Sequence, residues 1–220
     1  MYFMRKGYEP YSGRMRAMII IALFPLVVLL AQPLSNISNS YWIPVLLIGI
    51  AASAHQAWSA NLFTTVSDMF PKKSVGTVVG IGGMAGGVGG IVINKIGGWL
   101  FDAHRKKGIA DFWEQVKRTN LAETAEKVKS ATLLNRHGNM IDLNIRELYE
   151  LPQDVILQLQ SSIGLSPEQF EQLIAIQKPI VQGTMNASYA IMFTYCAVAY
   201  LLAWTIMKTL VPKHKPITDY

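Results

Sequence analysis

Polar side chains that could bind a solute or transfer a proton are concentrated in one otherwise apolar stretch, residues 54–70. They are His55, Gln56, Ser59, Asn61, Thr64, Thr65, Ser67 and Asp68. At 100° per residue, Gln56 and Ser59 share one face of a helix, with His55 at its edge. Polar groups in an apolar helix usually face a bundle interior or a water-filled cavity. This face therefore predicts a solute pathway or hydrogen bonds to neighbouring helices.

Two side chains of this stretch have a functional and a structural interpretation. Trp58 offers an apolar ring face that suits a sugar, although tryptophan also simply packs. Histidine titrates near neutral pH, so His55 could carry a proton, but a hydrogen-bonded structural histidine is the simpler interpretation. No carboxylate, arginine or lysine lies at the centre of an apolar stretch. The chain alone therefore lacks an evident group for ion coupling or for pairing with an anion.

The composition indicates a membrane protein with one polar insert. Of the 220 residues, 51% are hydrophobic and 15% are charged, against about 25% charged in soluble proteins. Residues 101–182 hold most of the acidic side chains, since only Glu9, Asp68 and Asp219 lie elsewhere. The net charge of +6 could suggest a nucleic-acid binder, but the basic residues form short clusters beside apolar runs. We expect contact with a lipid bilayer and none with nucleic acid.

Four apolar stretches reach the roughly 20 residues that a helix needs to cross a bilayer. They are residues 15–34, 41–70, 74–101 and 187–211. The first could also be a signal peptide, because basic residues precede it, yet no small-residue cleavage pattern follows. The pattern predicts an all-α membrane protein with four transmembrane helices and a helical soluble insert before the last one.

The lysine and arginine residues outside the insert predict the orientation. Nine of these ten residues fall beside the two termini or in the loop at residues 71–73. Basic residues in short loops favour the cytoplasmic side. Residues 1–101 are then a cytoplasmic loop with three helices, residues 102–182 an extracytoplasmic or periplasmic insert, and residues 183–220 the last helix with a cytoplasmic tail. The expected location is a plasma (inner) membrane.

The insert carries helix signals and no catalytic pattern. Ser166 with Gln169 forms a capping box, and the helix that starts there should stop before Pro179. A second short helix starts near Gln153 and can end at Gly164, and residues 110–134 are amphipathic. Because no nucleophile triad, His/Cys cluster or paired carboxylates occur, we expect a structural cap, with no enzyme activity, metal site or cofactor.

Glycines dominate the third apolar stretch. They include Gly76, Gly80, Gly82, Gly83, Gly86, Gly87 and Gly90. Four-residue glycine spacing lets helix backbones approach closely in lipid, so these residues predict helix packing. Residues 80–85 also match a dinucleotide-binding pattern, but that pattern needs a soluble strand, turn and helix, which this apolar run does not offer.

Residues 55–73, followed by residues 75–76 and 80–87, resemble the tenth and eleventh helices of hexuronate transporters. The matching segments are HQAWSANLFTTVSDMFPKK, VG and GIGGMAGG. These transporters belong to the anion:cation symporter family of the major facilitator superfamily. Residues 210–217 are similar to the family's cytoplasmic tail, and residues 5–16 to its basic loop before helix nine. The resemblance implies helices nine to twelve of a twelve-helix transporter, whose N-terminal helices would be the missing partner.

For the whole transporter, the resemblance implies uptake of glucuronate or galacturonate by proton symport through alternating access. The substrate would bind near the midplane between the two halves. Gln56, Ser59 and Asn61 would contact substrate hydroxyls, and Trp58 would line the pocket.

The resemblance also implies a cytoplasmic anchor, in which Asp68 meets Arg14 or Arg16. Gly83 stands where some carriers of sugar acids have an asparagine. An aldonate or dicarboxylate substrate, sodium as the coupling ion, and a non-transport four-helix membrane protein all remain alternatives.

Overall fold

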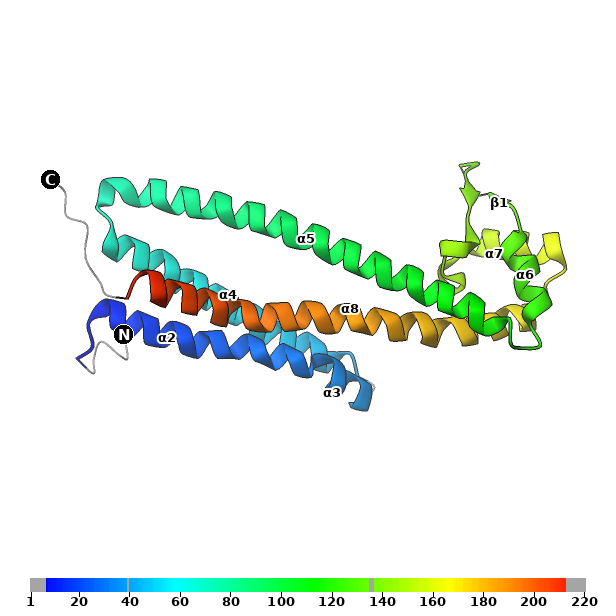
Figure 1. The fold of residues 1–220 in the computed structure, drawn as a ribbon, viewed down its shortest axis with the longest axis horizontal. Helices are drawn as coiled ribbons and strands as arrows, with labels where there is room; N and C mark the ends of the chain where they lie inside the picture. The colour runs from blue at the N-terminus through cyan, green and yellow to red at the C-terminus, as the bar shows by residue number, and fades with distance from the viewer. Residues whose placement is uncertain (1–6, 39, 135–136, 213–220) are drawn as a thin grey trace. The chain divides into compact units, whose positions relative to one another are not determined.

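The computed structural model describes residues 7–38, 40–134 and 137–212, and the chain divides into two compact units. Unit 1 comprises Met1–Lys95 and Tyr189–Tyr220, and unit 2 comprises Ile96–Ser188. Four helical segments are long and apolar enough to cross a membrane, as the sequence predicts, and their length and composition suggest a multi-pass membrane protein (Figure 1). The segments are Pro10–Ser35, Trp42–Met69, Lys72–Val116 and Pro167–Leu210. The basic residues Arg5, Lys6, Lys213 and Lys215 lie outside the described residues.

The first span of unit 1 changes its winding along its length. Helix α2 (Pro10–Leu23) begins with a proline, whose missing N–H is harmless in a first turn. It continues into the 3-10 helix η1 (Phe24–Leu30) and then α3 (Ala31–Ser38). Pro25 lies in the first turn of η1. The buried residues of this segment recur at every third position, because a 3-10 helix has three residues per turn. They are Ala22, Pro25, Val28 and Ala31.

Helix α4 (Trp42–Met69) lies beside α2 in unit 1 (Figure 1). It ends where Phe70 turns extended before Pro71, because proline disfavours the helical conformation in the residue before it. The core of this unit contains Tyr11, Met15, Met18, Ala22 and Trp58. The indole Nε1 of Trp204 donates to the Met15 carbonyl at 2.9 Å, which joins the end of the chain to α2.

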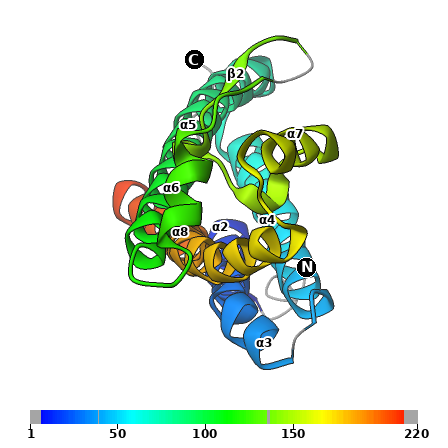
Figure 2. The same cartoon turned by 90° about the vertical axis from the view of Figure 1, so that its right-hand side faces the viewer.

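Unit 2 packs around an apolar core. Figure 2 shows the short elements of this unit. The unit holds the last part of α5 (Lys72–Val116), then α6 (Ala122–Ser130), β1 (Leu133–Leu134), β2 (Met140–Ile141), η2 (Leu143–Ile145), η3 (Leu148–Glu150), α7 (Gln153–Ile163) and the first part of α8 (Pro167–Leu210). Strands β1 and β2 pair antiparallel, with Leu133 opposite Ile141. The sequence predicts a helical insert. The structure is mostly helical there but also includes this two-stranded ribbon.

Two helix signals predicted for the insert are confirmed. The Ser166 N–H donates to Oε1 of Gln169, and the Gln169 N–H donates to Oγ of Ser166, both at 3.2 Å. Leu165 and Phe170 are both buried beside this capping box. Gly164 ends α7 with a φ of 68°, in the left-handed region that glycine adopts easily.

One predicted helix end in the insert is wrong, and the helices divide the insert differently from the apolar pattern. Helix α5 continues past the apolar stretch that ends at residue 101 and reaches Val116, and the amphipathic residues 110–134 divide between α5, α6 and β1. Helix α8 also runs through Pro179. An internal proline removes one hydrogen bond and costs about 3 kcal/mol. Burial of Leu173, Gln177 and Val181 on either side offsets that cost.

Candidate functional site

Most of the small polar side chains of α4 bond to their own helix. The Nδ2 of Asn61 donates to the Ala57 carbonyl at 2.8 Å, and Oγ1 of Thr65 donates to the Asn61 carbonyl at 2.8 Å. Thr64 and Ser67 make the same contact with the carbonyl four residues earlier. Such bonds satisfy the side chain without a second helix. Asn61 therefore has one amide hydrogen engaged locally, although the sequence analysis assigns it to substrate.

Gln56 and Ser59 differ from these residues. Gln56 is exposed and Ser59 is half-buried. Within residues 7–38, 40–134 and 137–212, neither side chain has a hydrogen-bond partner. Their role in contacting a substrate stays a prediction.

Trp58 lies in the core of unit 1. Its exposed fraction is 6%, and it packs there with Met15 and Met18. Its ring meets the Tyr200 ring edge-on, with centroids 5.4 Å apart and an interplanar angle of 70°. In these contacts Trp58 holds α4 against its neighbours, and the pocket lining that the resemblance implies for it stays a prediction.

A hydrogen bond links His55 to the last membrane-spanning helix. The Nδ1 of His55 lies 2.5 Å from the Tyr200 hydroxyl, and the ring centroids are 6.1 Å apart. His55 is among the polar residues predicted from the sequence, whereas Tyr200 is not. The two residues are 145 positions apart, and nothing in the local sequence distinguishes Tyr200 from other tyrosines in the same apolar stretch.

Arg14 and Asp68 form an ion pair at one end of the spans. Both Nε and Nη2 of Arg14 lie 2.8 Å from Oδ2 of Asp68. Arg16, the other candidate for this contact, places its guanidinium 3.9 Å from the centre of the Tyr8 ring instead. The two cations thus have different partners, and only Arg14 meets Asp68 among the described residues.

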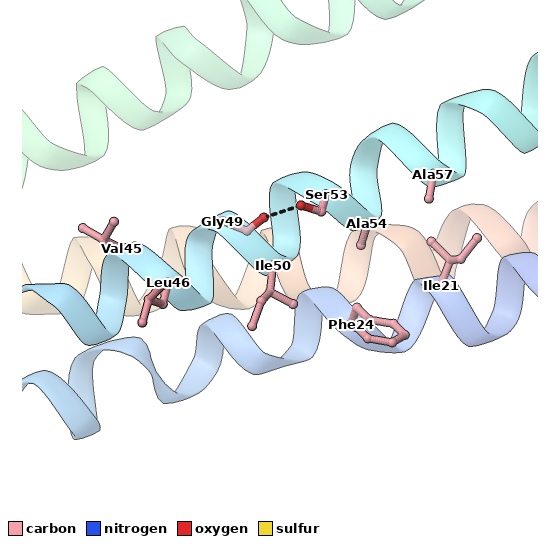
Figure 3. A pocket seen from close by; sticks show the side chains of 9 residues that line it. All are labelled: Ile21, Phe24, Val45, Leu46, Gly49, Ile50, Ser53, Ala54 and Ala57. Carbon is pink, nitrogen blue, oxygen red and sulfur yellow. Dashed lines mark hydrogen bonds between the residues drawn. The ribbon is translucent and has the colours of Figure 1, made fainter.

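A cavity of about 750 Å³ lies between α4 and the first span (Figure 3). Its lining comprises Ile21, Phe24, Val45, Leu46, Gly49, Ile50, Ser53, Ala54 and Ala57. The only hydroxyl in the lining, that of Ser53, donates to the Gly49 carbonyl at 2.9 Å. Gln56 and Ser59 do not line this cavity. The lining suits an apolar group and offers nothing that would bind a sugar acid.

The glycines of the predicted packing face have open surroundings. A Cβ added at Gly76, Gly80, Gly82, Gly83, Gly86, Gly87 or Gly90 would meet no atom within 4 Å among the described residues. The close helix approach occurs at Gly108 instead, where a Cβ would lie 2.3 Å from Oγ1 of Thr184 and 2.9 Å from Cα of Val181. The sequence analysis misses Gly108, because it lies in a charged stretch beyond the apolar run.

Unit 2 has a charged cavity of about 240 Å³. Arg105, Arg146, Glu147 and Glu150 line it together with Ile141, Leu151 and Pro152. Burial and, secondarily, the charge of Glu150 raise the pKa of Glu147, and the charge of Arg105 acts in the opposite direction. This cluster of opposite charges has no counterpart in the sequence-based predictions.

Neither the cavities nor the comparisons with known proteins identify a ligand. Among the described residues, no group of three or more His, Cys, Asp and Glu side chains could hold a metal ion. Comparison of the chain with known protein families, curated proteins and solved structures finds no match.

Proposed function

We propose that this chain is part of a membrane transporter for an organic anion, with a hexuronate as the first candidate substrate. The observation that carries the proposal is the open glycine-rich part of α5. None of the residues in its most apolar part is buried, and among the described residues no atom comes within 4 Å of a Cβ added at the glycines from Gly76 to Gly90. Glycine-rich helices in lipid normally pack closely against other helices. The open face suits contact with further helices, such as the N-terminal helices that the resemblance implies.

The polar face of α4 supplies the proposed substrate contacts. Gln56 and Ser59 have unpartnered polar groups, which suit the hydroxyls of a sugar acid. Asn61 contributes its second amide hydrogen and its carbonyl oxygen. Trp58 fixes α4 from behind through its contact with Tyr200. The substrate carboxylate would need a cation from helices outside this chain.

The Arg14–Asp68 ion pair is the proposed cytoplasmic anchor. It joins α2 to the last turn of α4, so separation of the two helices at this end must break it. Alternating access requires such a contact to open and close as the cytoplasmic side does. The proposed orientation has both termini in the cytoplasm and residues 102–182 outside the plasma membrane.

Uptake by proteoliposomes tests the proposal. The chain is reconstituted alone and with any helices encoded in frame upstream of its gene, and uptake of labelled glucuronate, gluconate and succinate is measured. An inward proton gradient is compared with an inward sodium gradient. We expect glucuronate uptake that responds to the proton gradient. Faster gluconate or succinate uptake would replace the substrate, and a sodium response would replace the coupling ion.

A matched pair of variants locates the substrate contact. Gln56→Leu is expected to reduce uptake by about tenfold or more, since a site that binds hydroxyls rejects a substrate whose partner is missing. Gln182→Leu, which changes an exposed glutamine of unit 2, should leave uptake unchanged. Absence of uptake of all three anions by correctly inserted protein would favour the non-transport alternative and overturn the proposal.

A further inference from the structure

His55 and Tyr200 bring two titratable groups together inside the membrane-spanning segments. Their hydrogen bond, 2.5 Å from Nδ1 to the hydroxyl oxygen, joins α4 to α8 in unit 1. The rings also meet edge-on at an interplanar angle of 65°. Histidine and tyrosine can each donate or accept a hydrogen bond, so the direction of this bond determines its chemistry.

The surroundings of Tyr200 indicate that its hydroxyl donates. Tyr200 is half-buried and packs against Trp58, and no second partner for its hydroxyl occurs among the described residues. If Nδ1 of His55 carried the hydrogen, the phenolic proton would have no acceptor there, which costs free energy in apolar surroundings. The phenol therefore donates to Nδ1, and the neutral imidazole carries its hydrogen on Nε2. Nδ1 is a basic nitrogen within the spans.

Several other charged and titratable groups of unit 1 lie on the same helices or on α2. On α8, Cys196 lies one turn from Tyr200. On α2, Tyr11 donates to the Val211 carbonyl, and Arg14 is paired with Asp68 of α4. These partners leave His55, which is exposed, as the group that can accept a proton at this contact.

We propose that His55, held by Tyr200, is a proton-binding site in the membrane-spanning part of the chain. A proton from water binds Nδ1 and gives the imidazolium a charge of +1. Nδ1 then becomes a donor, the phenol oxygen accepts, and the Tyr200 O–H rotates away from the ring. The phenolic proton loses its acceptor in this state, and the charge of the imidazolium strengthens the remaining bond and offsets that loss. The hydrogen bond between α4 and α8 persists, but His55 is now its donor and Tyr200 its acceptor. The bond is then charge-assisted. This proposal goes beyond the transport function, because it requires no anion and no further helices.

Nitrogen NMR of histidine in lipid vesicles tests the proposal. The chain is labelled with ¹⁵N-histidine, and each signal is assigned with a single His→Gln variant. At pH 8, we expect His55 to have a bare Nδ1 and a protonated Nε2. On acidification, Nδ1 should acquire a hydrogen. His104 is a built-in control, because its Nδ1 lies 3.0 Å from the Leu100 carbonyl, which can only accept. His104 should therefore show the opposite tautomer at pH 8.

Tyr200→Phe is the decisive variant, because it removes the hydroxyl and keeps the ring. It is expected to let part of the neutral His55 population carry its hydrogen on Nδ1 at pH 8, while the His104 signals stay as they are. Tyr195→Phe, on the same helix, is the matched control and should change neither signal. A protonated Nδ1 on His55 of the wild type at pH 8 would overturn the proposal. His55 signals that Tyr200→Phe leaves unchanged would also overturn it.

A double-mutant cycle covers the case in which a variant unfolds in vesicles. Thermal unfolding in detergent is measured for His55→Gln, Tyr200→Phe and the double variant at pH 5 and pH 8. The interaction between the two positions should be larger at pH 5, where the bond is charge-assisted. Equal interaction at both pH values would contradict proton binding at this contact. Neither experiment uses a transported anion, so failure of the transport proposal would leave their outcome unaffected.

Discussion

The two units bury their apolar side chains to very different extents. In unit 2, Phe112, Leu148 and Leu173 have exposed fractions of 0%. In unit 1, Ile81 and Val88 are 59% and 63% exposed on α5. A soluble domain buries its large apolar residues, whereas a transmembrane helix can present them to lipid. Unit 2 therefore has the core of a water-soluble domain, while unit 1 needs lipid or further helices around it.

The units also satisfy their polar groups in different ways. In unit 2, the fully buried Gln177 accepts from the Leu148 N–H at 2.6 Å and donates to the Arg146 carbonyl at 3.3 Å. In unit 1, the hydroxyls of Thr64 and Thr65 bond to carbonyls of their own helix. Side chains thus hold separate segments together in unit 2, but in α4 they mostly leave the contacts between helices to packing.

The largest difference between the units should follow from truncation of an apolar side chain. Phe112→Ala removes a fully buried ring and is expected to destabilise unit 2 by about 3–5 kcal/mol. Ile91→Ala, at a side chain of α5 that is 61% exposed, is the matched change in unit 1 and should cost far less in detergent. Hydrogen exchange followed by mass spectrometry reports each unit separately. Equal losses of protection would contradict the comparison.

A methyl group at the crossing of α5 and α8 should give the next largest effect. Gly108→Ala places a Cβ against Thr184 and the Val181 backbone, so overpacking is expected to cost about 1–3 kcal/mol. Gly183→Ala has open space and should be neutral or stabilising, because alanine favours helix. Thermal unfolding of the two variants measures the difference. A Gly108→Ala variant as stable as Gly183→Ala would show that the helices can separate at no cost.

Removal of the buried amide tests the polar contacts of unit 2. Gln177→Leu leaves the Leu148 N–H and the Arg146 carbonyl without this partner, which is expected to cost about 1–3 kcal/mol. Gln160→Leu in α7 is the control. Gln160 is half-buried, and among the described residues its side chain makes no hydrogen bond to another segment like those of Gln177. Chemical unfolding monitored by exchange of the amides at residues 146–148 provides the measurement. Unchanged protection there would mean that packing alone holds this segment.

The ion pair of unit 1 should contribute less. The Arg14 and Asp68 side chains are 22% and 35% exposed, and accessible pairs are worth about 0.2–1 kcal/mol. Arg14→Gln and Asp68→Asn are therefore expected to lower the unfolding temperature slightly, and the double variant no more than either alone. Arg16→Gln, which leaves the pair intact, is the control. Additive losses in the double variant would show that the two side chains act independently.

The smallest effect should depend on pH. The raised pKa of Glu147 means that the folded protein releases this proton at higher pH than the unfolded chain. Stability from this group is thus complete below the ordinary pKa of glutamate and falls as pH rises through the folded value. Glu147→Gln should match the wild type at acidic pH and exceed it at pH 7.

Glu123→Gln gives the opposite sign. A hydrogen bond from Lys127, together with its charge, lowers the pKa of Glu123. The glutamine variant should therefore lose slight stability at neutral pH and none in acid. Unfolding temperatures from pH 4 to pH 7 separate the two variants. Parallel curves would contradict the assignment of burial as the cause at Glu147.

Features that depend on neighbours in the sequence are predictable here, and contacts between distant residues are not. The capping box at Ser166 and the left-handed Gly164 are local patterns with a direct backbone consequence. The four spans follow from length and apolarity. The partners of His55 and Gly108 depend instead on which faces of α4, α5 and α8 meet, and one sequence does not contain that information.

The error at Pro179 has the same origin. Proline is a sound local signal for a helix end, but the cost of about 3 kcal/mol is smaller than the gain from burying the surrounding side chains. Trp58 illustrates the converse for the candidate site. An aromatic ring in a polar stretch suits a sugar, and only the packing of α2 and α8 shows that its faces are already covered.

The 3-10 winding of η1 affects both the reach and the helical phase of the first span. Seven residues at about 2.0 Å per residue extend the span by roughly 3–4 Å beyond an α-helix. Each of these residues also turns about 20° more than in an α-helix. The faces of α3 are therefore rotated by about 140° from where a continuous α-helix would place them. If Pro25→Ala restored α-helical winding, Ala31 would leave the face that it shares with Ala22, and the span would match a thinner bilayer.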